Sequence, residues 1–273
     1  MTRKIIKIFG ADVQNFLQNL ITNNLNSCTA DNPIYSCLLN PKGRYQFDFF
    51  IIKLEDYLLL DINETQAEAF LQALKYRKLI AKVNFEILEN YTVYNTKSKI
   101  DNCIISYKDP RLDILGYRTI STEAISINKL MLNYNEIRYQ NAIPEAKDFT
   151  YDKSIPIEFG MDELRALSYN KGCYLGQEFT NSAKNRMAIR RRLISITSDF
   201  SMTKDDVLIN EAGLEVGKIV SSISLHSEIS LKTHEKFLAL ALFKMPHKDQ
   251  NIFMLEKEVK KHIPSWIKIY SME

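Results

Sequence analysis

The segment from Lys171 to Glu178, K-G-C-Y-L-G-Q-E, combines the residue types of this chain that are best suited to chemistry. Glycines on both sides of Cys173 let the backbone turn sharply and approach a ligand. The ammonium of Lys171 favours the thiolate form, Gln177 and Glu178 add hydrogen-bonding and acidic groups, and Tyr174 completes the candidate catalytic set. The pattern suits a nucleophile, a redox thiol or a single metal ligand. The structural alternative is an ordinary helix–loop with a buried cysteine.

The cysteine pattern limits the metal chemistry that one chain can perform. No C-x-x-C pair and no zinc or ferredoxin-type spacing is present among Cys28, Cys37, Cys103 and Cys173. In a reducing cytoplasm we expect four free thiols. A cluster held by one chain usually takes four thiolates from compact motifs, so we expect no permanent metal. Cys173 remains a candidate transient iron–sulfur ligand.

The first half of the chain predicts the frame that positions these residues. Asp12 is expected to cap a helix whose apolar residues repeat at helical spacing. The expected elements are a strand at 5–9, a helix from 13, a turn at 40–43, strands at 45–54 and 57–62, a helix at 64–78 and a strand at 83–88. This order predicts an α+β layer with helices on one sheet face.

The second half predicts a different architecture. Helices are expected at 130–138 and 162–168. After Arg190 the sequence pattern changes. Short alternating stretches then follow at 193–197, 214–222, 237–243, 252–259 and 267–270. Such stretches, separated by turn-forming residues, are typical of a small antiparallel barrel or sandwich. We therefore expect two regions, 1–190 and 191–273.

Several motifs together resemble the YgfZ family, which includes mitochondrial iron–sulfur assembly proteins and is related to the glycine-cleavage T-protein. The segments that carry the resemblance are K-G-C-Y-L-G-Q-E at 171–178, G-A-D at 10–12, N-P-K-G-R at 40–44, D-x-R at 109–111 with G-x-R at 116–118, 134–144, and 215–222. The chain departs from the family pattern at Ala142, Ser182 and Met187. The resemblance implies an α+β fold, a three-lobed ring with two interlocked ferredoxin-like lobes and a C-terminal antiparallel β-barrel.

The resemblance also implies a tetrahydrofolate pocket. The pterin of folate is flat and pairs with a carboxylate while stacking on an aromatic ring. Glu158 matches a pterin-binding glutamate of the T-protein, Asp48 matches one of its paired aspartates, and Tyr134 falls where family members carry an aromatic residue against the folate. Arg44 and Arg186 complete the expected folate-binding set. The structural alternatives are a salt-bridged Glu158, an outward-facing Asp48 and a core or surface Tyr134.

Other charged residues of the chain are also candidates for binding or structural roles. A basic run follows the cysteine motif, and it comprises Lys184, Arg186, Arg190, Arg191 and Arg192. It suits folate glutamates, a cluster-bearing partner or RNA phosphates, or else a solvated strand edge. Asp109, Arg111 and Arg118 are expected to form a structural ion-pair set. The four histidines show no metal-ligand spacing.

Composition excludes some classes of protein. The chain has 273 residues and a formal net charge of +3, too small to imply a nucleic-acid partner by itself. Neither an apolar run of membrane-spanning length nor a secretory signal is recognisable. From these features we expect a cytoplasmic protein with no membrane partner and no direct nucleic-acid partner.

Three functions compete. The first is a folate-binding accessory factor for iron–sulfur cluster assembly or repair, which the resemblance links to tRNA-modifying enzymes, with assembly proteins or client enzymes as partners. The second is a tetrahydrofolate-dependent aminomethyl transferase, which is disfavoured because Phe47 replaces one of the paired aspartates. The third is an RNA-binding module that uses the basic run. We expect no ordinary enzymatic turnover, and a folate-dependent transferase if the chain is an enzyme.

Overall fold

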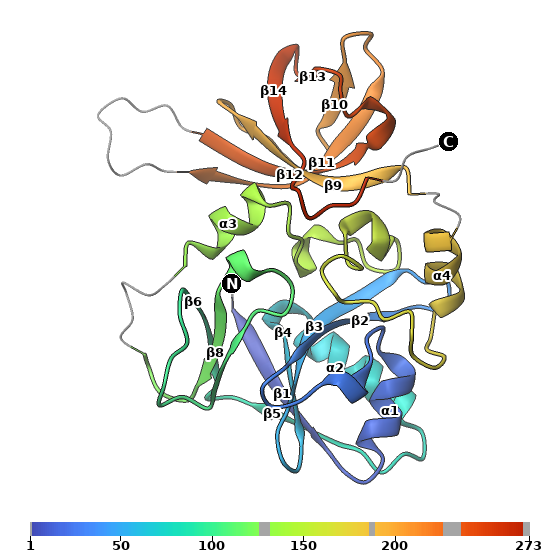
Figure 1. Cartoon of the computed structure of the whole chain (residues 1–273), viewed down its shortest axis with the longest axis vertical. Coiled ribbons are helices and arrows are strands. Elements are labelled where there is room, and N and C mark those ends of the chain that lie inside the picture. Colours follow the sequence, from blue (N-terminus) through green and yellow to red (C-terminus); the bar gives the residue numbers. More distant parts are fainter. Residues whose placement is uncertain (1, 126–131, 186–188, 226–235, 270–273) are drawn as a thin grey trace. The chain divides into compact units, whose positions relative to one another are not determined.

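The protein is described by a computed structural model that covers residues 2–125, 132–185, 189–225 and 236–269 (Figure 1). These residues form two compact units that alternate along the chain. Unit 1 comprises 1–132, 151–153 and 164–181, and unit 2 comprises 133–150, 154–163 and 182–273. The region boundary expected at 190 falls at the start of a barrel strand, and division of the chain into domains there stays a prediction.

The main sheet of unit 1 has five antiparallel strands in the order β2-β3-β4-β1-β5. Its elements are β1 (Arg3–Phe9), α1 (Val13–Leu20), β2 (Ile34–Leu39), β3 (Tyr45–Lys53), β4 (Leu58–Asn63), α2 (Glu64–Lys78) and β5 (Asn84–Leu88). Both helices pack on one face of this sheet, because a single apolar core contains Phe16 and Leu17 of α1 and Phe70 and Leu74 of α2. The expected α+β layer is confirmed.

Helix α2 forms where the sequence predicts it. The side chain of Asn63 accepts a hydrogen bond from the backbone N–H of Thr65 at 3.0 Å and so caps the first turn. The last turn carries Lys75, Arg77 and Lys78, whose charges complement the helix dipole. The expected cap of α1 is wrong, because the carboxylate of Asp12 accepts instead from the N–H of Lys82 at 2.7 Å.

Unit 1 also contains a second, three-stranded antiparallel sheet in the order β6-β8-β7. Its strands are β6 (Thr92–Thr96), β7 (Ile105–Lys108) and β8 (Tyr117–Ser121). The ion pairs expected among Asp109, Arg111 and Arg118 are confirmed: Arg111 binds Asp109 at 2.7 Å, and an Arg118 nitrogen lies 3.8 Å from the same carboxylate. Arg118 also contacts Asp61 of β4, so a buried ion pair joins the two sheets.

Unit 2 is built around a closed six-stranded barrel, coloured orange to red in Figure 1, in the order β10-β11-β12-β9-β14-β13. Its helix and strands are α3 (Tyr134–Gln140), β9 (Arg191–Ser198), β10 (Val207–Asn210), β11 (Glu215–Leu225), β12 (Lys236–Lys244), β13 (Ile252–Met254) and β14 (Lys257–His262). The barrel interior is filled by aliphatic, methionine and aromatic side chains. Of the two expected alternatives, a barrel and a sandwich, the structure thus confirms the barrel.

Three other expectations about helices and strands are wrong. The helix expected at 162–168 is a series of turns, with Arg165 at a φ of +60° that interrupts helical geometry. The strand expected at 252–259 is split into β13 and β14 by Leu255 and Glu256, both at positive φ. Residues 267–269 form no strand. Among the described residues, no helix is both long and apolar enough to span a lipid bilayer.

Candidate functional site

The cysteine motif lies in unit 1, between a stretch of turns and helix α4 (Gln177–Asn185). The Cys173 thiol is exposed, whereas the thiols of Cys28 and Cys37 are buried and that of Cys103 is half-buried. Burial raises the pKa of the Cys28 thiol to about 11. Cys173 therefore combines exposure with a place in the motif, which the buried-cysteine alternative does not predict.

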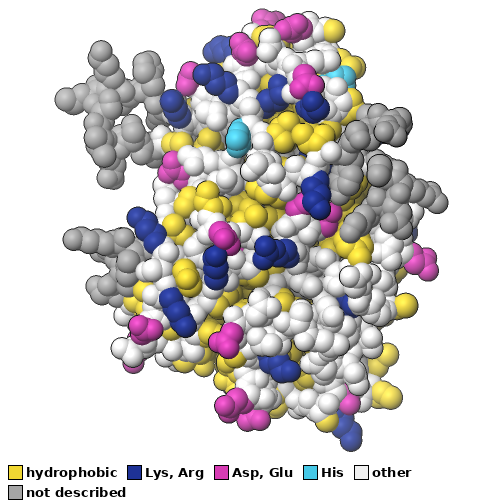
Figure 2. All heavy atoms as spheres, in the orientation of Figure 1, with side chains coloured by type: hydrophobic (Ala, Val, Ile, Leu, Met, Phe, Trp, Pro, Cys, Tyr) yellow, Lys and Arg dark blue, Asp and Glu magenta, His cyan; other side chains and the backbone are white. Residues whose placement is uncertain are grey.

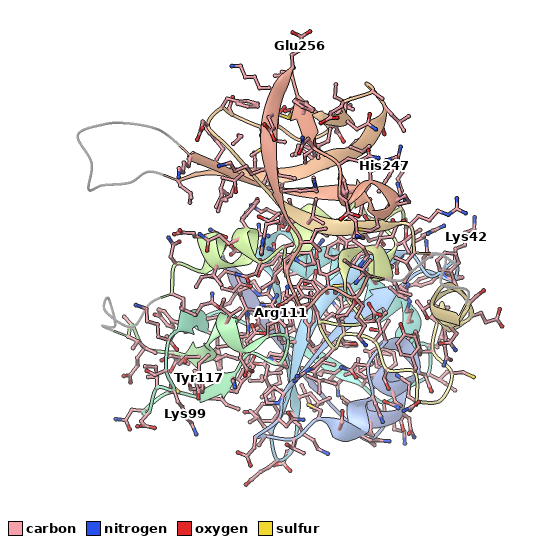
Figure 3. All side chains as sticks on the ribbon, turned by 45° about the horizontal axis from the view of Figure 1, so that its top comes forward. Lys42, Lys99, Arg111, Tyr117, His247 and Glu256 are labelled. Atoms are coloured by element: carbon pink, nitrogen blue, oxygen red, sulfur yellow. The ribbon has the colours of Figure 1, made fainter. Side chains whose placement is uncertain are left out.

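Gly176 fixes the shape of this segment. Its φ is +85°, and a Cβ at this position would lie 2.6 Å from the carbonyl oxygen of Asn40 and 3.0 Å from the Cα of Gly43. The motif and the Asn-Pro-Lys-Gly turn thus touch backbone to backbone, while Lys42 at the same turn points outward (Figure 3). A side chain at Gly172, by contrast, would meet nothing within 4 Å. Only the second glycine is required by the packing.

Lys171 is bound to helix α1 and its following loop. Its ammonium donates hydrogen bonds to the backbone carbonyls of Gln18, Ile21 and Asn23 at 2.6, 2.7 and 2.9 Å. These carbonyls lie at or just past the end of α1, where carbonyls lack partners within the helix. Burial lowers the pKa of Lys171 to about 8. The residue anchors the cysteine segment, a role that the sequence did not predict.

Tyr174 and Gln177 also hold the loop. The Tyr174 ring is buried, and its hydroxyl lies 2.9 Å from the hydroxyl of Thr180 in α4. The Tyr174 N–H donates to the Gln177 side chain at 3.2 Å, and the Gln177 N–H donates to the Tyr174 carbonyl, also at 3.2 Å. Glu178 is exposed in the first turn of α4. Within the predicted catalytic set, Cys173 and Glu178 are therefore the exposed members.

An open groove of about 670 Å³ runs beside the thiol. It is lined by Asn19, Leu20, Tyr76, Arg77, Leu79, Cys173, Tyr174 and Leu175. None of these lining residues is His, Asp or Glu, so the described part of the groove offers Cys173 no side-chain general base. This lining suits binding or metal ligation better than hydrolytic or transfer chemistry. The apolar end of α2 in this groove was missed from the sequence.

Arg44 lies against the motif from the neighbouring turn. Its guanidinium is 4.5 Å from the centre of the Phe179 ring of α4. Its Nη1 is buried and has no hydrogen-bond partner within the described part of the chain. A buried guanidinium nitrogen usually finds an acceptor, so this atom fits an anionic group supplied from outside the chain.

Asp48 is buried in β3 rather than facing outward. Its carboxylate accepts hydrogen bonds from the hydroxyls of Tyr35 at 2.8 Å and Tyr45 at 2.5 Å. Burial and the nearby Asp48 charge raise the pKa of both tyrosines, so both stay protonated and keep donating. The outward-facing alternative for Asp48 is wrong, and the carboxylate is held in a fixed position.

Glu158 and Tyr134, the other expected folate residues that the structure describes, belong to unit 2. Glu158 lies in a 3₁₀ turn, Pro156–Phe159, and pairs with Arg191 through two hydrogen bonds of 2.9 and 3.0 Å. Tyr134 is buried, and its hydroxyl donates to Glu145, so its ring is not an exposed stacking surface. Arg186 lies outside the described residues. Glu158 and Tyr134 thus have their partners within unit 2.

The expected basic run is partly used inside unit 2. Arg191 binds Glu158, and the buried Arg192 donates to the carbonyl of Ile157 at 2.9 Å and to Glu163. On the face drawn in Figure 2, Lys and Arg side chains are interspersed with Asp and Glu rather than gathered in one patch. The side chain of Lys184 lies outside the described part. These observations give no support to an RNA-binding surface.

Lys171 gives a direct test of the thiolate hypothesis. We expect Lys171→Met to increase backbone hydrogen exchange across 168–176, because three carbonyls lose their donor. We expect the rate of Cys173 alkylation at a fixed pH to change little, because three hydrogen bonds hold the ammonium at the end of α1 rather than at the thiol. Mass spectrometry measures both quantities on one sample. A clear loss of alkylation rate in the variant would instead restore Lys171 as the activating cation.

Comparison with solved structures shows which class of fold this is. No family model matches the chain. The glycine cleavage system aminomethyltransferase T from Bartonella henselae superposes with a TM-score of 0.71 at 14% sequence identity, covering 96% of this chain and 83% of that one. The chain therefore has the aminomethyltransferase T fold, a mixed α+β architecture with a barrel, as predicted.

Curated relatives point to a particular kind of protein with this fold. They carry the name iron–sulfur cluster assembly factor IBA57, mitochondrial, or a homolog of it. The one from Pyricularia oryzae is 29% identical over 71% of this chain and 55% of its own length. Those from Dictyostelium discoideum and Homo sapiens are 26% and 23% identical over 80% and 79% of this chain, and 66% and 71% of their own lengths.

Two consequences follow from these relatives. The chain spans about half to two thirds of the length of the first relatives that it matches. The relatives are named as mitochondrial proteins, which contradicts the expectation of a cytoplasmic protein. That expectation was drawn from composition and from the absence of recognisable signals, and neither feature determines the cellular compartment of a protein.

Proposed function

We propose that this chain is an accessory factor of the YgfZ type in iron–sulfur cluster assembly or repair, with Cys173 as a redox thiol or transient cluster ligand. The observation that carries the proposal is an exposed thiol on a segment anchored at both ends, by Lys171 to α1 and by Gly176 to the 40–43 turn. The relatives named as iron–sulfur cluster assembly factors support it. Tightly held geometry is what a ligand needs to receive or pass on a metal group.

The number of thiols defines what the chain does with a cluster. One exposed cysteine supplies one protein ligand, so the remaining ligands of an iron–sulfur cluster come from partners or small thiols. The cluster is thus cargo that is shared during transfer rather than a resident group. Assembly proteins and client enzymes, including tRNA-modifying ones, are the proposed partners.

Tetrahydrofolate is the proposed small-molecule ligand. Arg44 would bind an anionic group of folate through its buried Nη1, which lacks a partner within the described part of the chain. Asp48, held by two tyrosine hydroxyls, and Glu158, Tyr134 and Arg186 are the other proposed binding residues. Tyr134 would have to leave its buried position beside Glu145 to stack on the pterin. Arg191 would have to release Glu158 for a direct contact with the pterin. When bound, folate supplies a carrier for one-carbon groups, and this chain's residues bind and orient it.

The proposal is tested by rescue of bacteria that lack their own YgfZ-type protein. We expect the wild-type chain to restore methylthio-modified tRNA and four-iron dehydratase activity, and Cys173→Ala to restore neither at equal protein level. Cys103→Ser is the matched control, because that thiol is half-buried and lies outside the groove. Equal rescue by Cys173→Ala would reduce the thiol to a structural role.

The second candidate is a tetrahydrofolate-dependent aminomethyl transferase, which the shared fold with aminomethyltransferase T favours. Such an enzyme needs carboxylates to manage protons at the folate nitrogen, and Phe47 beside Asp48 leaves one where the T-protein pattern has two. Turnover of an aminomethyl donor that depends on Asp48, together with failure of the wild type to rescue, would favour this candidate.

A further inference from the structure

The groove beside Cys173 has an apolar rim that is exposed among the described residues of unit 1. At the end of α2, Tyr76 is 84% exposed, Leu79 is 85% exposed and Ile80 is 99% exposed. Tyr76 and Leu79 line the groove together with the thiol. Clustered exposed side chains of this size mark interaction sites more often than chance surface exposure does.

The backbone at Leu79 adds to this observation. Its φ is +47° and its ψ is −116°, a conformation that an L-residue other than glycine adopts at a cost of about 1–3 kcal/mol. Leu255, another exposed leucine with positive φ, sits in the tight turn between β13 and β14, where two consecutive positive-φ residues suit the hairpin. Leu79 follows a helix, where glycine would remove the strain. A strained and exposed leucine there indicates a contact outside the chain.

The positive charges beside the rim indicate which kind of partner surface would bind there. Lys75, Arg77 and Lys78 occupy the last turn of α2, and the described lining of the groove contains no acidic residue. The Arg77 guanidinium donates to the Ala73 carbonyl at 3.0 Å and to the Gln46 side chain at 2.8 Å, so its charge is not neutralised by these acceptors. A second copy of this chain would bring the same cations to the contact, which is unfavourable. An acidic surface would be complementary.

The shape argues for a macromolecule rather than a small ligand. A groove of about 670 Å³ is large enough for a drug-sized molecule, but Ile80 lies outside its lining and nearly all of its surface faces water. Covering all three rim side chains takes a surface that extends beyond the groove.

We propose that the groove and its rim, formed by Tyr76, Leu79 and Ile80, dock an acidic partner protein that places an apolar side chain in the groove and its own sulfur beside Cys173. This inference rests on the proposed function and names the chemistry of the partner. Steering by the basic turn brings the partner to the surface, and the apolar contact orients it toward the thiol.

Defined peptide probes test the surface without knowledge of the partner. Two short peptides carry the same leucines and one cysteine activated as a mixed disulfide with 5-thio-2-nitrobenzoate, one with flanking glutamates and one with lysines. The Cys173 thiolate attacks the peptide sulfur, the new disulfide forms, and yellow 2-nitro-5-thiobenzoate leaves. The full chain carries Cys103→Ser, so that Cys173 is the exposed thiol that reacts.

We expect the acidic peptide to react about tenfold faster than the basic one at low salt. A rim variant with Tyr76→Ser, Leu79→Asn and Ile80→Ser should slow the acidic peptide several-fold and leave iodoacetamide, a small neutral reagent, unchanged. Leu255→Asn is the matched control, an exposed leucine with a similar positive φ far along the sequence. Equal rates for the two peptides, or an unchanged rate in the rim variant, would overturn the proposal.

Two further measurements separate the explanations. Sedimentation should show a monomer, and a dimer that the rim variant abolishes would assign the surface to a second copy and overturn the proposal. In the bacterial assay the rim variant should fail to rescue while remaining folded, as judged by circular dichroism. If the peptides discriminate but Cys173→Ala rescues fully, the docking surface stands and the proposed role of the Cys173 thiol falls. If Cys173→Ala loses rescue and the two peptides react equally, the role of the thiol stands and the docking surface falls.

Discussion

Replacement of Asp61 by asparagine is expected to lower the free energy of unfolding by about 3–5 kcal/mol. Asp61 is fully buried in β4 and binds Arg3 at 2.6 Å and Arg118 at 2.5 Å. The guanidinium of Arg118 also lies 3.9 Å from the centre of the Phe50 ring. Asparagine keeps the shape but removes the carboxylate that both arginines share, and Arg118 keeps the carboxylate of Asp109 at 3.8 Å. Urea denaturation followed by fluorescence measures the difference.

Asp56→Asn is the matched control, because Asp56 is exposed in the turn between β3 and β4. This variant should stay within about 0.5 kcal/mol of wild type. A loss below about 1 kcal/mol in Asp61→Asn would mean that water or rearrangement compensates the two arginines.

The ion pairs of Asp61 also make the stability of the protein depend on pH. Burial alone would raise the pKa of Asp61, but Arg118 and Arg3 hold it below its usual value of 3.8. The unfolded chain therefore takes up this proton first as the pH falls. The contribution of Asp61 is fully present above about pH 4 and is lost as the pH falls through the lowered pKa. Wild type should lose stability below pH 4 more steeply than Asp61→Asn.

Substitution of Gly176 by alanine should cost about 2–4 kcal/mol and abolish rescue in the bacterial assay. The new Cβ would combine a φ of +85° with a contact of 2.6 Å to the backbone oxygen of Asn40. Backbone atoms cannot swing away as a flexible side chain can, so the cysteine segment must move. Thermal denaturation and rescue are the two measurements.

Gly213→Ala provides a control for the backbone strain alone. Its φ is +74°, and a Cβ there would meet nothing within 4 Å, so about 1 kcal/mol is expected. Gly172→Ala, one residue before Cys173, should be close to neutral, since its φ is not strained and its surroundings are open. If Gly176→Ala and Gly213→Ala cost the same, the close packing of the motif on the 40–43 turn contributes nothing.

Helix ends and single strands were largely predictable, because they depend on residues that are near one another in the sequence. Helix α2 begins and ends where its cap and basic last turn indicate. The alternation after Arg190 predicted β9, β11 and β12, whereas β10 was missed and β13 and β14 were expected as one strand. The three-stranded sheet and the Asp61 ion pairs were missed. Asp61 and Arg118 are 57 residues apart, and no periodicity connects them.

The candidate site shows the same limit. Cys173 was chosen for its motif, and its exposure agrees with that choice. Lys171 was expected to act on the thiol two residues away, yet its ammonium binds carbonyls about 150 residues earlier. Glu158 and Tyr134 have partners, Arg191 and Glu145, that only the folded chain brings near. Residue type predicts what a group can do, whereas its partners come from long-range packing.

The anchoring of Lys171 also sets an order of events during protein synthesis. Unit 1 is completed by residues 164–181, which are made after the segment 133–150 of unit 2. A nascent chain that ends before residue 164 already contains the five strands of the main sheet. The carbonyls at the C-terminal end of α1, however, still lack their lysine donor. The thiol therefore takes its held position late, so fragments from interrupted synthesis do not present a finished site.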